Sequence, residues 1–156
     1  MKKIFFFLSF ILLLTSCGSD DDICLGEEST PRMKVKFRNA NNQLMQMDSL
    51  YVDVNYGKTV DTNILVGVRV DSIFVPLRID DSPYTDLYVR RRKNEAKSKI
   101  RIHYDSKSIY VSPPCGFKKN YENLSAELLE TGPVQSIQSN QTSLTDETSI
   151  NFYLRF

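Results

Sequence analysis

The chain has 156 residues, with 20 lysines and arginines against 19 aspartates and glutamates. A formal charge of +1 at pH 7 excludes a strongly basic protein and gives no reason to expect binding to nucleic acid. The length fits one domain of ordinary size.

The first 17 residues have the order of a bacterial lipoprotein signal. Lys2 and Lys3 precede an apolar run over residues 4–14 that only Ser9 interrupts. Spanning ~30 Å of hydrocarbon takes about 20 apolar residues, so this run indicates a cleaved secretory signal rather than a permanent membrane helix. The sequence Leu-Thr-Ser-Cys that follows resembles a lipobox and predicts that residues 1–16 are removed.

Cys17 is therefore expected to carry the lipid and to begin the mature chain. An ordinary secretory peptide, cut near Ser16 or Gly18, is the alternative. Each buried methylene contributes about 0.8 kcal/mol to membrane binding, and two or more acyl chains anchor a protein stably. The expected partner is thus a membrane, which the chain contacts through the lipid on Cys17.

An acidic segment follows the lipidation site, with Ser19, Asp20, Asp21 and Asp22 in succession. Because like charges repel, residues 17–31 are expected to form an extended, flexible tether. The pattern Cys-x-Ser-Asp-Asp-Asp also resembles the export signal that carries lipoproteins of Bacteroidota to the outer face of the outer membrane. It favours the cell surface over the periplasmic face, and a plain tether is the alternative.

Cys24 and Cys115 are the only cysteines left once Cys17 carries lipid. In an oxidising compartment they are expected to form a disulfide, which would join the foot of the tether to residues 113–116. Closing a loop of about 90 residues stabilises the folded chain by ~4 to 5 kcal/mol in the chain-entropy model. A metal site is a poor alternative, because two cysteines and one distant histidine lack ligand spacing. No metal and no cofactor is expected.

Short runs of alternating apolar and polar residues dominate residues 32–156, which are expected to form a single β-rich domain. The alternation typical of half-buried strands is clearest at residues 33–38, 50–56 and 150–156. In the second of these strands, Leu50, Val52, Val54 and Tyr56 are expected to face the core. Further strands are expected at residues 64–70, 73–79, 86–92 and 134–138. Pro76 cannot donate a ladder hydrogen bond, so its strand belongs at a sheet edge or carries a bulge.

A hairpin is predicted where two apolar runs flank a polar triplet. Residues 99–104 and 108–112 lie on either side of residues 105–107, whose sequence Asp-Ser-Lys favours a turn.

One short helix near residues 117–130 is the exception to the strand pattern. Phe117, Tyr121, Leu124 and Leu128 recur at helical spacing, although asparagines within the segment weaken a helix. The overall prediction is an all-β fold, an antiparallel β-sandwich of immunoglobulin-like or similar type.

Several features are spread over the mature chain. They are the cysteine-anchored tether, the second cysteine at residue 24, Thr-Pro-Arg at residues 30–32, Cys-Gly-Phe at residues 115–117 and an aromatic C-terminal strand. Together they resemble a family of small Bacteroidota lipoproteins of unknown function. The resemblance supports the membrane address and the disulfide, and it implies no catalytic residue.

Motifs that would indicate catalysis are missing from the sequence. His103 is the only histidine and is expected to be an exposed strand residue. The sequence has no glycine-rich phosphate loop, no His-Glu-x-x-His and no EF-hand loop. We therefore expect a non-enzymatic binding or structural component of the cell envelope. The alternatives are a hydrolase whose carboxylates only folding brings together and a carbohydrate-binding module.

Tyrosines on strand faces opposite the aliphatic side chains are the candidate binding residues. Tyr51, Tyr88 and Tyr153 could contact another envelope protein or a glycan, although tyrosines also commonly cover the outer faces of sheets. The four cations at residues 90–93 could contact lipid A phosphates or an acidic glycan, or form a solvated strand end.

Two serines lie in a short acceptor-like motif. Ser49 in Asp-Ser-Leu and Ser72 in Asp-Ser-Ile resemble the site of O-glycosylation in the periplasm of Bacteroidota. If these serines are glycosylated, both are expected to lie at the start of a strand and to face solvent.

Overall fold

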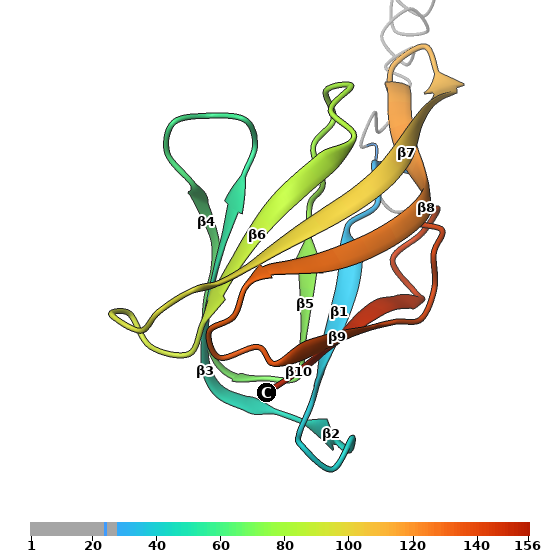
Figure 1. Ribbon diagram of the computed structural model, residues 1–156. Helices are drawn as coiled ribbons and strands as arrows, with labels where there is room; N and C mark the ends of the chain where they lie inside the picture. Colours follow the sequence, from blue (N-terminus) through green and yellow to red (C-terminus); the bar gives the residue numbers. More distant parts are fainter. Residues whose placement is uncertain (1–23, 25–27) are drawn as a thin grey trace, which may run out of the picture.

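Strands make up most of the chain that the structure describes, which is Cys24 and residues 28–156 of a computed structural model (Figure 1). In chain order they are β1 (Met33–Arg38), β2 (Leu44–Met45), β3 (Met47–Asn55), β4 (Thr62–Val70), β5 (Ser72–Val75), β6 (Tyr84–Arg90), β7 (Ser98–Ser112), β8 (Gly116–Glu130), β9 (Ser136–Ser139) and β10 (Ile150–Arg155). Among these described residues, no helix has the length and apolar character needed to cross a bilayer. The all-β prediction is confirmed.

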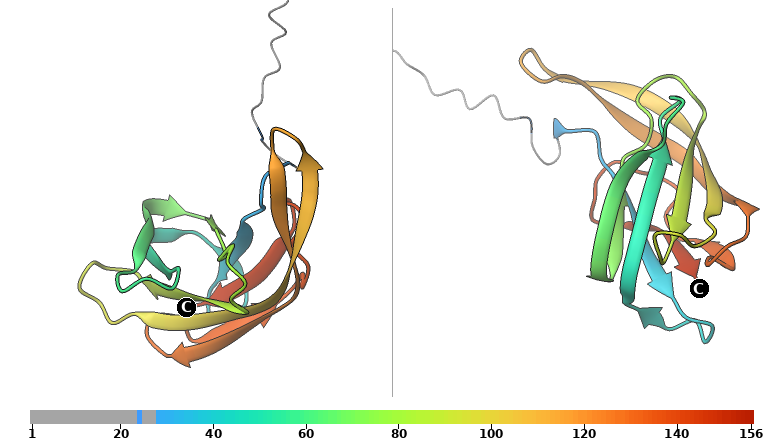
Figure 2. Two further views of the ribbon diagram at one scale, coloured as in Figure 1. Left: turned by 90° about the horizontal axis from the view of Figure 1, so that it is seen from above. Right: turned by 90° about the vertical axis from the view of Figure 1, so that its left-hand side faces the viewer.

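The strands form two sheets that are mostly antiparallel (Figure 2). In the first sheet, β1 pairs with β10 in parallel, and its other edge pairs with β5 and then β2. Strand β9 completes this sheet beside β10. The second sheet has the order β4-β3-β6-β7-β8 and is antiparallel throughout. The sandwich prediction holds, with one parallel pair between the first and last strands.

Alternating side chains from both sheets fill one core. Val35 and Phe37 of β1 face the core from the first sheet, and both are buried. The second sheet contributes Leu50, Val52 and Val54 of β3, all fully buried as the sequence predicts. Each such side chain contributes roughly 1.5 to 3 kcal/mol when removed from water, so the period-two pattern fixes which face of each strand is inside.

The C-terminal residue of the chain is tied to this core. The backbone N–H of Phe156 donates to the carbonyl of Arg38 at 3.0 Å, and the Phe156 ring meets Phe37 edge to face at 5.9 Å between centroids. The closing strand predicted at residues 150–156 is confirmed. Strand β5 pairs with β1 alone among the described strands, as an edge strand does. The strand predicted over residues 73–79 is wrong in its extent, because β5 ends at Val75 and Pro76 lies outside it.

The turn predicted at residues 105–107 is wrong. Strand β7 runs through these residues without interruption, and they pair with residues 120–122 of β8. The hairpin turn lies instead at residues 113–115, directly before Gly116 with a φ of 65°. Polar residues are tolerated in this part of β7 because residues 105 and 107 are exposed and residue 106 is only half-buried. The hairpin extends from there beyond the rest of the sandwich (Figures 1 and 2).

The helix predicted near residues 117–130 is also wrong, because this segment is strand β8. A β-bulge explains the misleading spacing. Asn123 and Leu124 lie together opposite Tyr104, and Asn123 has a φ of 55°. One extra residue shifts the phase of a strand by one position, so Tyr121 and Leu124 both reach the core although they are three residues apart. Phe117, in contrast, is largely exposed.

Candidate binding face

The outer face of the second sheet carries an array of tyrosines and cations, which we call the tyrosine–cation face. Strict alternation along three neighbouring strands places these side chains opposite the buried aliphatic ones. The face consists of Tyr51 and Asp53 on β3, Tyr84, Asp86, Tyr88 and Arg90 on β6, Lys99, Arg101 and His103 on β7, and Lys97 directly before β7.

Each of the three tyrosines on this face lies next to a cation. The guanidinium of Arg101 lies 4.0 Å from the centroid of the Tyr84 ring, in the range of a cation–π contact. Arg90 lies 5.7 Å from the ring of Tyr51. The ammonium groups of Lys97 and Lys99 lie 5.2 and 5.7 Å from the ring of Tyr88. These contacts limit the rotamers that the long basic side chains can adopt.

The carboxylate of Asp53 links β3 to side chains on β4 and β6 and to Lys97. Asp53 is buried, and its carboxylate lies 3.1 Å from Arg90 Nη2 and 3.3 Å from Lys97 Nζ. The side-chain amide of Asn63 donates to its other oxygen at 2.7 Å. A buried carboxylate requires such partners, because an isolated buried charge is strongly unfavourable.

Asp86 has the same role between β6 and β7. Arg101 donates to both of its oxygens, from Nε at 2.7 Å and from Nη2 at 2.9 Å, and Lys99 Nζ lies 3.4 Å away. The hydrogen bonds from Arg101 lower the pKa of Asp86, and they outweigh its desolvation, which acts in the opposite direction. Asp86 is therefore ionised at neutral pH and holds Arg101 over Tyr84.

An apolar margin borders this face on edge strand β4. Val66 lies opposite Tyr51 and Val68 lies opposite Ser49, so both valines project to the outer side of the sheet. Their exposed fractions are 64% and 74%. Adjacent exposed aliphatic and aromatic side chains, with charged residues around them, are typical of a surface that contacts another macromolecule.

The paired carboxylates that a hydrolase would need are not arranged as an acid and a base. Asp53 and Asp86 are diagonal neighbours on β3 and β6, which places their Cα atoms about 7 Å apart. A glycoside hydrolase requires one carboxylic acid whose pKa is raised. Here the pKa of Asp86 is lowered by Arg101, and Asp53 forms ion pairs with Arg90 and Lys97.

The other predicted surface residues are distributed over both sheets. His103 lies on β7 in the tyrosine–cation face, half-exposed, with Nε2 3.5 Å from Glu127 Oε2. Its ring centroid lies 6.3 Å from that of Tyr84. Tyr153 lies on the first sheet under the guanidinium of Arg38, at 3.9 Å. The structure therefore brings Tyr51 and Tyr88 together and leaves Tyr153 apart from them.

The basic run at residues 90–93 is a strand end followed by a turn. Arg90 closes β6 and pairs with Asp53. Arg91 pairs with Glu95 at 3.1 Å, and Glu95 also accepts the backbone N–H of Arg92. Two of the four cations are thus already paired within the protein.

The two serines predicted as glycosylation sites are half-exposed strand residues. Ser72 begins β5 and donates to Asp71 Oδ1 at 3.0 Å. Ser49 is the third residue of β3 and donates to the carbonyl of Arg91 at 2.6 Å. Modification of either serine stays a prediction.

Two of the concavities formed by the described residues lie outside the tyrosine–cation face. One has a volume of about 420 Å³ and is lined by Tyr56, Lys58, Leu77, Arg78, Ile79 and Asp80. The other has a volume of about 320 Å³ and is lined by Met45, Gln46, Met47, Asp48, Ser49, Arg91, Arg92 and Phe156. Each lining contains a single carboxylate, and a hydrogen bond from Arg78 lowers the pKa of Asp80, so neither offers a paired acid and base.

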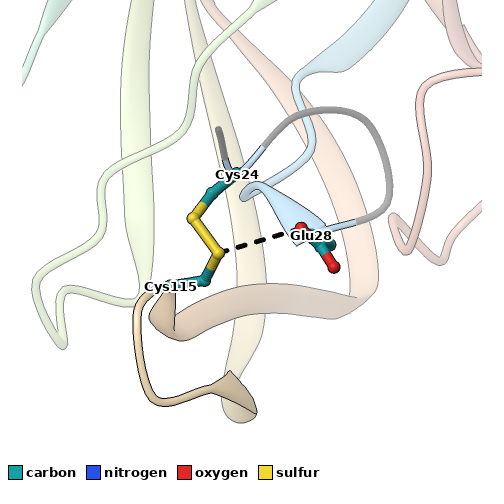
Figure 3. Close-up of side chains that lie close together, drawn as sticks. All are labelled: Cys24, Glu28 and Cys115. Atoms are coloured by element: carbon teal, nitrogen blue, oxygen red, sulfur yellow. Dashed lines mark hydrogen bonds between the residues drawn. A yellow bond between two sulfur atoms is a disulfide. The ribbon is translucent and has the colours of Figure 1, made fainter. Parts of the chain in front are cut away.

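The predicted disulfide is present and lies at the tip of the β7–β8 hairpin (Figure 3). It joins Cys24 and Cys115 with a Cα–Cα distance of 5.7 Å. The carboxylate of Glu28 lies 3.8 Å from Cys115 Sγ. Although these three side chains cluster like metal ligands, both sulfurs are bonded to each other and offer no thiolate. Cys17, Ser19, Asp20, Asp21 and Asp22 lie outside the described residues.

Sequence reasoning missed Tyr84, Asp53 and Asp86 as members of the face. The predicted strand started at residue 86, so Tyr84 was left out. The outward-facing polar residues of β6 and β3 were not considered together. The alternation Tyr84-x-Asp86-x-Tyr88-x-Arg90 was the available signal, because side chains two apart share one face. Which residues of β7 lie next to them depends on the register between β6 and β7. That register cannot be predicted from the sequence of one strand.

Comparison with known proteins finds two matches along the chain. Residues 40–156 match a family of unknown function, DUF6452. Residues 1–17 match the prokaryotic membrane lipoprotein lipid attachment site, which indicates a membrane-anchored lipoprotein. The attachment-site match ends at Cys17, the residue expected to carry the lipid. No curated protein and no solved structure matches the chain significantly.

Proposed function

Because this chain belongs to DUF6452, a family of unknown function, we propose its role from its own surface: a non-enzymatic lipoprotein that binds another envelope protein. The tyrosine–cation face and its valine margin form the binding surface. One observation carries the proposal. Exposed Val66 and Val68 lie on the strand next to a set of tyrosines. These tyrosines contact cations, of which Arg90 and Arg101 are held by ion pairs.

The composition of the face suits a protein partner. Tyrosine and arginine are enriched in protein interfaces and often contribute most of the binding energy. Side chains held by cation–π contacts and ion pairs lose little conformational entropy on binding. The four cations of the face (Arg90, Lys97, Lys99 and Arg101) form ion pairs with its two acids, Asp53 and Asp86. Asp61 and Glu127 border the face and pair with Lys97 and His103, so we expect recognition to depend on contact more than on net charge.

The two alternative functions receive less support from the same geometry. A sugar that stacks on a tyrosine needs an open ring face, and the rings of Tyr51, Tyr84 and Tyr88 each have a cation within 6 Å. A hydrolase needs an acid with a raised pKa, and the pKa of Asp86 is lowered. These observations favour a binding protein over a glycan-binding module or a hydrolase.

We place the domain on the outer membrane, with the cell surface favoured over the periplasmic face. The acidic run from Asp20 to Asp22 after Ser19 supports this location through its resemblance to an export signal. Protease accessibility of intact cells, compared between the wild type and a variant with alanines at residues 20–22, tests it. Equal protection of both chains would contradict surface exposure.

The binding role is tested by capture from chemically cross-linked cells. The variant V66D/V68D places two charges in the apolar margin, and both side chains are exposed, so folding is expected to persist. The matched control is V60D, an equally exposed valine outside the strands of this face.

The wild type and V60D are expected to recover the same envelope protein, and V66D/V68D is expected to lose it. Equal recovery by all three chains would contradict a role for this face. Turnover of a glycan or peptide by the purified chain would contradict a non-enzymatic function.

A further inference from the structure

The β7–β8 hairpin projects beyond the sandwich (Figures 1 and 2). Its tip carries exposed apolar side chains. Tyr110 on β7 and Phe117 on β8 are register partners, with exposed fractions of 57% and 71%. Their rings meet edge to face with centroids 5.4 Å apart. Ile109, Pro113 and Pro114 are also exposed. A tip of this kind has no part in the core of the sandwich.

Covalent connections place this tip near the lipid anchor. Cys17 precedes Cys24 by seven residues, and seven residues span at most about 25 Å whatever path they take. Cys24 is bonded to Cys115 in the hairpin turn. Cys115 in turn lies only two residues before Phe117, about 7 Å along a strand.

Two more contacts align the incoming chain with the hairpin. Thr30 Oγ1 accepts a hydrogen bond from the backbone N–H of Lys119 at 3.0 Å. Glu28 lies beside the disulfide (Figure 3). Cys24, Glu28 and Thr30 therefore each contact the β7–β8 hairpin before the chain enters β1.

The chemistry of the tip matches a bilayer surface. Residues 106–121 contain three lysines and no acidic residue. Lys107 pairs with Glu122 and Lys119 with Asp81, while residues 109–117 at the tip itself carry no charged side chain. Aromatic rings with a polar group are enriched at the membrane–water interface, and lysines can keep their charge near head groups while their stems cover apolar surface.

We propose that the tip of the β7–β8 hairpin, with Ile109, Tyr110 and Phe117, contacts the same lipid bilayer that holds the anchor at Cys17. The hairpin then acts as a second, non-covalent attachment point and orients the sandwich on the membrane. Arg101 lies eleven residues from Ser112 along β7, about 36 Å at 3.3 Å per residue, so the tyrosine–cation face stands clear of the lipid. The inference rests on lipid anchoring and does not depend on the proposed partner protein.

The absence of tryptophan from the chain permits a direct test. F117W places a single indole at the tip, and L44W places one on β2, an exposed position far from the hairpin in Figure 1. Each lipidated full-length variant is reconstituted in vesicles of phosphatidylethanolamine and phosphatidylglycerol, with dibrominated phosphatidylcholine as a short-range quencher. Flotation verifies that the anchor is inserted.

In floating chains, the emission of F117W is expected to shift to shorter wavelength and to lose intensity to the brominated lipid, while L44W shows neither change. Y110W repeats the test on the neighbouring strand if F117W does not fold. Unshifted, unquenched emission from the tip variants in floating chains would overturn the proposal. Equal quenching at L44W would overturn it as well, because the sandwich would then lie flat on the membrane.

Discussion

Asn123 donates a hydrogen bond from Nδ2 to Asp105 Oδ2 at 2.7 Å. The two residues lie at the β-bulge where β8 pairs with β7. Asn123 has a φ of 55°, in the left-handed region that asparagine and glycine tolerate better than other residues. The bulge brings both Tyr121 and Leu124 into the core, so a single backbone conformation determines which side chains of β8 are buried.

Replacement of Asn123 with valine should therefore destabilise the protein. A β-branched residue at positive φ costs of order 1 to 3 kcal/mol, and the hydrogen bond to Asp105 is lost as well. N123G keeps the backbone conformation and should cost less than N123V. Urea denaturation measures both, and equal free energies of unfolding for the two variants would contradict the proposed role of the bulge.

Reduction of the Cys24–Cys115 disulfide should lower stability without changing the sheet. The loop it closes has a sequence separation of 91, for which the chain-entropy model gives ~4 to 5 kcal/mol. Thermal unfolding of an unlipidated C17S chain, with and without reductant, measures the loss. The same chain with C24S/C115S is the control and should not respond to reductant. An unchanged melting temperature of C17S on reduction would contradict the prediction.

Stability should fall in acid because of Asp86. Arg101 lowers the pKa of Asp86 in the folded state, so the unfolded chain binds more protons between that value and the unfolded value of about 3.9. The contribution of Asp86 is fully present above about pH 4 and is lost as the pH falls through the folded-state pKa. Urea midpoints from pH 7 to pH 2 should fall less steeply in D86N than in the wild type. Identical slopes would show that Asp86 makes no such contribution.

Alternation along single strands was sufficient to predict much of the fold. Residues 33–38 and 150–156 were predicted as strands, and Leu50, Val52 and Val54 as core residues, because period two reports directly which side is buried. The parallel pairing of β1 with β10 joins the first and last of the described strands. No local pattern in either segment encodes that pairing.

The errors arose where one local pattern has two physical causes. Tyr121 and Leu124 are three residues apart, which fits a helix and also fits a strand interrupted by a bulge. The triplet at residues 105–107 is polar because the hairpin is exposed, not because the chain turns there. For the candidate site, Tyr51 and Tyr88 were predicted, whereas the pairing of Asp86 with Arg101 depends on the register between β6 and β7.

The tyrosine–cation face is tested most directly by site-specific photo-crosslinking in living cells. A benzophenone amino acid replaces Tyr88 in one chain and Tyr153 in the other. Both tyrosines are half-exposed and lie next to basic side chains, but they are on different sheets. A partner that binds the face should give a discrete protein adduct from residue 88 and none from residue 153. No adduct from residue 88, or equal adducts from both positions, would contradict the proposed binding surface.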